Sequence, residues 1–123
     1  MGVALWVAQG LLAAAFLGAG ATKLSQPKEK LAKNMGWVED FSQPAVRLIG
    51  AVEVLGALGV VLPALTGILP WLTPLAAVGL VLTMIGAALT HLRRKEYGTI
   101  AAPAVLLVLA AFVAYGRFFI PGA

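Results

Sequence analysis

Apolar residues dominate four stretches of the chain, and most of the charged residues fall between them. The stretches cover residues 3–24, 45–62, 71–92 and 100–120. Each is close to the roughly 20 residues with which an α-helix crosses a bilayer's hydrocarbon layer of about 30 Å. Strands are not expected, because the stretches lack the alternating pattern of a membrane barrel and an open strand edge cannot be satisfied in lipid. The pattern predicts an all-α fold, an integral membrane antiparallel four-helix bundle forming a single domain over residues 1–123.

Composition supports this class of protein. Hydrophobic residues make up 61% of the 123 residues, against about 45–50% in soluble domains. The chain has no cysteine and a single histidine. Disulfides, thiolate metal sites, iron–sulfur ligation and a bis-histidine haem are therefore excluded, and we expect neither a metal nor a haem cofactor.

The basic residues predict an orientation in the membrane. Eight of the nine lie in the links that join the first span to the second and the third to the fourth, or at the span ends beside these links. They are Lys23, Lys28, Lys30, Lys33, Arg47, Arg93, Arg94 and Lys95. By the positive-inside rule, these links are cytoplasmic and both termini lie outside, in a multi-pass protein of the cell membrane. The net charge of +4 then needs no nucleic-acid partner, since insertion and anionic lipids account for it.

Prolines predict where helices begin and end, and small residues predict the faces on which the helices pack. Pro63 is expected to end the second span, and Ser25 with Pro27 to start a short helix in the inner link. Stripes of small residues predict the faces on which the helices pack, because helices associate in lipid by close backbone approach. The glycines expected at these contacts are Gly18, Gly50, Gly56, Gly79 and Gly86.

A single glutamate interrupts the second apolar stretch. Glu53 lies about 12 Å along the helix from its cytoplasmic start, where a charged side chain costs about 2.5–3.5 kcal/mol in insertion measurements. Such residues normally face the bundle interior and find a partner. Lys23 and His91 end the first and third spans on the same side of the membrane. We therefore predict a buried cluster of Glu53, Lys23 and His91.

Two hydroxyl groups extend this predicted cluster. Thr83 and Thr90 share one helical face with the third-span glycines and approach the depth of Glu53. The cluster has two interpretations, which the residues alone leave open: a ligand or proton site, or a polar contact that only joins helices.

Four segments resemble the DoxX-like family of small four-helix membrane proteins. They are "FLGAGATKL" at the end of span one, "RLIGAVEVLGALGVVLP" in span two, "MGWVEDF" in the inner link and "GAALTHLRRKE" at the end of span three. The resemblance covers nearly the whole chain, and the order of the segments makes it specific. It implies recurrent polar positions at Lys23, Glu53 and His91, and it suggests a quinone as a candidate ligand, since the family's name comes from a subunit associated with a membrane quinone oxidoreductase. Other members are linked to oxidative-stress complexes or assist membrane-protein assembly.

Three functions remain open from the sequence. The first is a subunit that binds a lipid-like small molecule, with Glu53 as acceptor, Lys23 as counter-ion and His91 as donor to a quinone-like carbonyl. The second is an assembly or scaffolding factor, and the third is a proton-coupled exporter. The expected partners are the lipid bilayer and other membrane subunits or a second copy. Independent enzymatic activity is not expected, because no nucleophile elbow, metal spacing or phosphate loop occurs in the sequence.

Overall fold

The described part of the chain is mostly helical. The computed structural model describes residues 2–31 and 41–119, and within them no strand occurs. The long helices are α1 (Gly2–Ser25), α3 (Gln43–Gly59), α5 (Leu72–Arg93) and α6 (Ala101–Phe119). The short ones are α2 (Lys28–Leu31), α4 (Leu62–Thr66) and the 3-10 helix η2 (Tyr97–Thr99). Four segments are long and apolar enough to span a membrane, which confirms the all-α membrane bundle.

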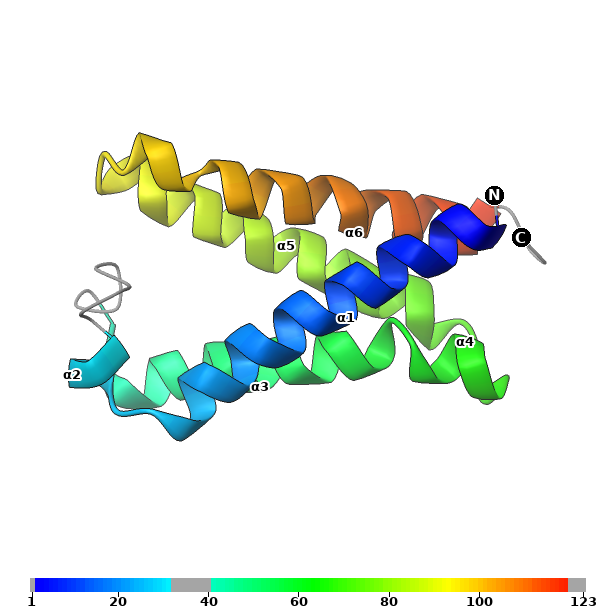
Figure 1. Cartoon of the computed structure of the whole chain (residues 1–123), viewed down its shortest axis with the longest axis horizontal. Helices are drawn as coiled ribbons and strands as arrows, with labels where there is room; N and C mark the ends of the chain where they lie inside the picture. The colour runs from blue at the N-terminus through cyan, green and yellow to red at the C-terminus, as the bar shows by residue number, and fades with distance from the viewer. Residues whose placement is uncertain (1, 32–40, 120–123) are drawn as a thin grey trace.

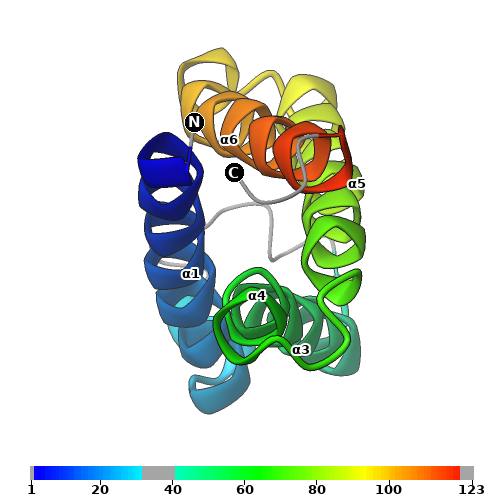
Figure 2. The same cartoon turned by 90° about the vertical axis from the view of Figure 1, so that its right-hand side faces the viewer.

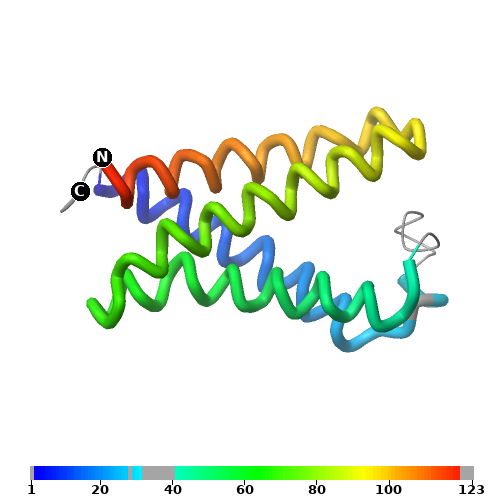
Figure 3. The backbone as a smooth tube through the Cα atoms, turned by 180° about the vertical axis from the view of Figure 1, so that it is seen from behind, coloured from blue at the N-terminus to red at the C-terminus, as the bar shows by residue number. Residues whose placement is uncertain are grey.

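The long helices form two antiparallel pairs. α1 packs mainly against α3, and α5 packs mainly against α6. Smaller contacts of α1 with α6 and of α3 with α5 close the ring, which Figure 2 shows end-on. Helix α1 begins and α6 finishes at one end of the bundle, while α2 lies at the other (Figure 1). The two pairs diverge toward this second end, called here the α2 end, as the reverse view also shows (Figure 3).

The tightly packed core lies away from the α2 end. Its largest members include Leu12 and Phe16 of α1, Val60 after α3, Leu80 of α5 and Val113 of α6. These residues lie near the middle of their helices or toward the end where α1 begins. The core therefore holds the pairs together at that end and leaves space between them at the α2 end.

Glycines permit the closest helix crossing, but only some of those predicted do so. A Cβ on Gly50 would lie 2.8 Å from the carbonyl oxygen of Gly20, and a Cβ on Gly20 would lie 2.6 Å from that of Gly50. Gly56 similarly makes room for Leu80. The backbones of α1 and α3 thus touch at Gly20 and Gly50, as expected for helix contacts in lipid. Gly20 was not among the predicted positions.

The other three predicted glycines do not make close contacts. No atom lies within 4 Å of a Cβ built on Gly18, Gly79 or Gly86, outside the local helix. The reason on α5 is that the helix buries a neighbouring face, the one with Ala77 and Leu80. The face of α5 that carries Gly79 and Gly86 is therefore exposed or borders open space.

The second span is broken earlier than predicted. Helix α3 ends at Gly59, and Pro63 lies in the first turn of α4 instead of ending α3. Pro63 has no N–H to donate to the carbonyl of Gly59, so an α-helix cannot continue through this point. The break frees backbone groups that neighbouring helices satisfy: Gln9 of α1 donates to the carbonyl of Val60 at 2.5 Å, and Thr73 of α5 accepts from the N–H of Ala64 at 3.1 Å.

Gln9 also connects α1 to α6. Its Oε1 accepts a hydrogen bond of 2.8 Å from Nε of Arg117, whose guanidinium lies 5.1 Å from the ring centre of Trp6. The one basic residue outside the two inner links is therefore held by α1 at the end opposite α2.

The inner link differs in detail from its prediction. A short helix does form, but Ser25 belongs to α1 rather than capping α2, and its hydroxyl donates to the carbonyl of Thr22. Leu31 is buried against Val46 and Phe41. Leu31 of α2 thereby packs beside the start of α3.

Candidate functional site

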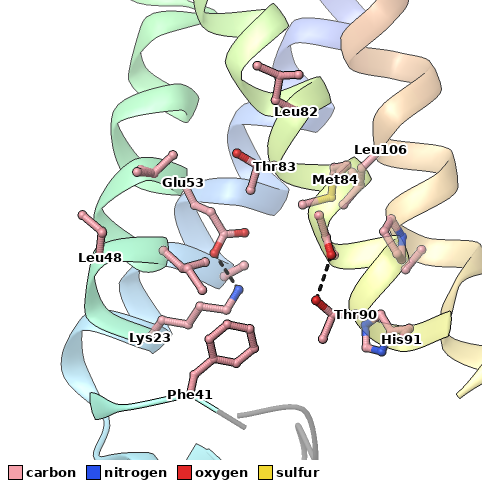
Figure 4. A pocket seen from close by; sticks show the side chains of 17 residues that line it. Lys23, Phe41, Leu48, Glu53, Leu82, Thr83, Met84, Thr90, His91 and Leu106 are labelled. Carbon is pink, nitrogen blue, oxygen red and sulfur yellow. Dashed lines mark hydrogen bonds and ion pairs between the residues drawn. The ribbon is translucent and has the colours of Figure 1, made fainter. Parts of the chain in front are cut away.

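A cavity of about 600 Å³ occupies the space between the two helix pairs at the α2 end (Figure 4). Every long helix contributes to its lining, together with Phe41. All five side chains of the predicted polar cluster line it, namely Lys23, Glu53, Thr83, Thr90 and His91. These five residues therefore lie around one space, and of the contacts predicted for Glu53 the one with Lys23 is present.

Lys23 and Glu53 form a buried ion pair on the α1/α3 side of the cavity. Nζ of Lys23 lies 2.6 Å from Oε1 of Glu53, and the two side chains are 9% and 3% exposed. The close contact of α1 and α3 at Gly20 and Gly50 explains how the two charged groups meet. A Cβ on Gly50 would lie 2.9 Å from Cβ of Lys23, so the absence of a side chain at Gly50 makes room for the start of the lysine side chain.

His91 is bound to a different carboxylate from the one predicted. Its Nδ1 lies 3.0 Å from Oε1 of Glu96, and Nε of Arg94 lies 3.4 Å from Oε2 of the same group. The described contact of His91 is therefore with Glu96, and the predicted three-residue cluster is divided between the two sides of the cavity. Since a carboxylate accepts, Nδ1 of His91 donates to Glu96.

Sequence reasoning missed Glu96 because the residue lies beyond the end of α5. Lys95 adopts a left-handed conformation with φ of 60°, which turns the chain back after the helix. The N–H of Glu96 then donates to the carbonyl of His91 at 2.8 Å. The only signal in the sequence is a carboxylate shortly after a helix end that is rich in basic residues.

The carboxyl group of Glu96 is expected to titrate below the usual range. The hydrogen bond from His91 is the largest cause that lowers its pKa, and Arg94 adds to the effect. Because the folded-state pKa is lowered, the contribution of this contact to stability is present above the unfolded-state pKa and is lost as the pH falls through the folded value. We expect His91→Gln to raise the pKa of Glu96, measured by NMR titration of its side chain. An unchanged titration would contradict the contact.

The hydroxyl groups of Thr83 and Thr90 donate hydrogen bonds within α5. Thr83 donates to the carbonyl of Gly79 at 2.9 Å, and Thr90 donates to that of Gly86 at 2.8 Å. Each hydroxyl proton is thus occupied, while the oxygen retains lone pairs. Neither threonine has a described hydrogen bond to Glu53, so they contribute to the cavity wall without joining the ion pair.

The described residues suggest no metal centre. Within residues 2–31 and 41–119, no group of three or more His, Cys, Asp and Glu side chains is placed to hold a metal ion. The polar groups of the site instead form one ion pair on the α1/α3 side and the group of His91, Arg94 and Glu96 near the end of α5. Such an arrangement suits hydrogen bonding to a polar group that enters the cavity.

Comparison with known proteins identifies the family. A family model described as the DoxX-like family matches residues 7–113. Neither the curated proteins nor the solved structures gave a match. The match to the family model includes the four long helices in whole or large part, together with Lys23, Glu53 and His91. The chain therefore belongs to the DoxX-like family.

Proposed function

We propose that this membrane protein binds a lipid-like small molecule, a quinone or a compound of similar shape, in the cavity between its helix pairs. The observation that carries the proposal is the buried Lys23–Glu53 pair in the lining of a cavity of about 600 Å³. This volume is within the range of about 300–1,000 Å³ that is typical of ligand pockets. A ligand-binding subunit of a larger membrane redox or stress-response complex is one form of the same proposal.

The surroundings of the ion pair suit an amphiphilic ligand. Leu82, Met84 and Leu106 contribute apolar lining, where the tail of a ligand would lie, with its polar head near Lys23 and Glu53. Two lining residues, Leu48 and Leu82, are 66% and 64% exposed on the protein surface. In a bilayer such side chains face acyl chains, which gives a lipid-like ligand a lateral route to the site.

We also propose that the α2 end faces the cytoplasm of a cell membrane. Lys23, Arg47 and Arg93 belong to this end, whereas Arg117 lies near the other. The positive-inside rule favours this orientation, with both termini outside. The cavity would then open near the inner leaflet.

A scaffolding or assembly role is the second candidate. The distance of 2.6 Å between Lys23 and Glu53 supports it, because the two charges satisfy one another across α1 and α3 without a ligand. A proton-coupled exporter has less support. The ammonium group of Lys23 repels cationic substrates from the one acidic side chain within the span.

Ligand binding is tested with a benzoquinone that carries a decyl chain, added to purified protein in lipid nanodiscs. We expect saturable binding that Gly86→Leu weakens about tenfold or more, because the new side chain occupies a position that lines the cavity. Isothermal titration calorimetry measures the affinity. Glu53→Gln should weaken binding as well, since it alters the polar group near the ligand's head.

Gly10→Leu is the matched control. Gly10 is also an exposed helical glycine with no atom within 4 Å of a built Cβ, and it does not line the cavity. Its variant should bind as the unmodified protein does. Absence of saturable binding to the unmodified protein, or equal binding to the Gly86→Leu variant, would leave the scaffolding role as the better explanation.

A further inference from the structure

We infer that the ligand of this cavity carries a neutral hydrogen-bond donor on its head group, such as the hydroxyl of a phenol, a quinol or a lipid alcohol. This inference rests on the proposed function and narrows it. A head group with only carbonyl oxygens would accept hydrogen bonds but donate none. Such a head group could accept from the ammonium of Lys23, but it would leave the acceptors of α3 and α5 that line the cavity without a donor.

The carboxylate of Glu53 provides the first acceptor. Its Oε1 is occupied by Lys23, whereas its Oε2 has no hydrogen bond to any residue that the structure describes. Figure 4 shows this second oxygen directed away from Nζ of Lys23. Glu53 is 3% exposed and lines the cavity. Because this charged oxygen has no described protein donor, a ligand hydroxyl would supply a hydrogen bond to it.

The α5 side of the cavity presents further acceptors. The hydroxyl protons of Thr83 and Thr90 are used by carbonyls of their own helix, so only their lone pairs remain. The described lining of α3 and α5 therefore offers the acceptor oxygens of Glu53, Thr83 and Thr90.

The local charges favour a neutral donor over a cationic one. Lys23 with Glu53 and Arg94 with Glu96 each contribute one positive and one negative charge. Arg47, Arg93 and Lys95 add positive charge at the same end of the bundle, where Glu29 of α2 adds one negative charge. An ammonium head group would be repelled by this excess, whereas a hydroxyl would not.

The test compares two probes that share one skeleton, 4-nonylphenol and its methyl ether 4-nonylanisole. The ether lacks the donor and keeps the aromatic ring and the tail. We expect the unmodified protein in nanodiscs to bind the phenol about tenfold more tightly than the ether, because a hydrogen bond to a charged group is among the stronger ones. The preference should decrease in the Glu53→Gln variant.

A second substitution tests the donor inference at a residue outside the Lys23–Glu53 pair. Thr83→Val removes a lining acceptor and should reduce the preference for the phenol, whereas Thr66→Val, at the far end of the bundle, should not. Equal affinity for the two probes, both lost in Gly86→Leu, would overturn the donor inference and leave the proposed function in place. Binding of the decyl benzoquinone but of neither nonyl probe would also overturn the donor inference alone, and binding of none of the three would overturn both.

Discussion

Replacing Lys23 by methionine is expected to lower the free energy of unfolding by about 3 kcal/mol, because it leaves the carboxylate of Glu53 buried without its partner. The lysine and glutamate side chains are 9% and 3% exposed, and their charged atoms are 2.6 Å apart. A polar contact between membrane helices averages only about 0.6 kcal/mol. The larger value applies here because a charge is stranded, rather than a contact merely lost. Unfolding in mixed micelles with increasing dodecyl sulfate, followed by circular dichroism, measures the change.

The double variant Lys23→Met with Glu53→Gln separates these two effects. Removing both charges leaves no uncompensated ion, so the double variant should be more stable than the sum of the single changes predicts. Lys30→Met is the matched control, since Lys30 is exposed on α2, and it should change stability by less than about 0.5 kcal/mol. Additive losses, or equal stability of the Lys23 and Lys30 variants, would show that the ion pair does not join α1 to α3.

Gly20→Ala is expected to destabilise the bundle by about 2 kcal/mol, which is typical of an overpacked contact. The added methyl would lie 2.6 Å from the carbonyl oxygen of Gly50 and 2.9 Å from the backbone nitrogen of Val54. Backbone atoms cannot rotate away as a side chain can, so α1 and α3 must separate. That movement should also lengthen the Lys23–Glu53 contact. The same micelle unfolding experiment measures the loss.

Gly18→Ala provides the control from the same helix. Gly18 is two residues earlier, yet no atom lies within 4 Å of its built Cβ. Alanine is the better helix former by about 0.5–1 kcal/mol, so this variant should be as stable as the unmodified protein or more so. Similar losses in both variants would mean that helix propensity, not the crossing at Gly20, controls stability here.

The sequence by itself determined the class of fold and the depth of the polar residues. The four apolar stretches correspond to α1, α3, α5 and α6, with bounds that differ by no more than a few residues. This succeeds because spanning a bilayer imposes a length and a composition that are readable locally. The inward position of Glu53 followed from the cost of a charge in lipid, and Lys23 followed from its place at the inner end of span one.

Only the tertiary structure decided which groups meet. Lys23 and His91 end their spans on the same side, yet Lys23 reaches Glu53 and His91 contacts Glu96. The difference comes from the crossing of α1 and α3 at Gly20 and Gly50, and from the reversal of the chain at Lys95. Periodicity along one helix gives a face and a depth. It contains no information on which neighbouring helix approaches that face or how closely, because backbone contacts between distant segments set both.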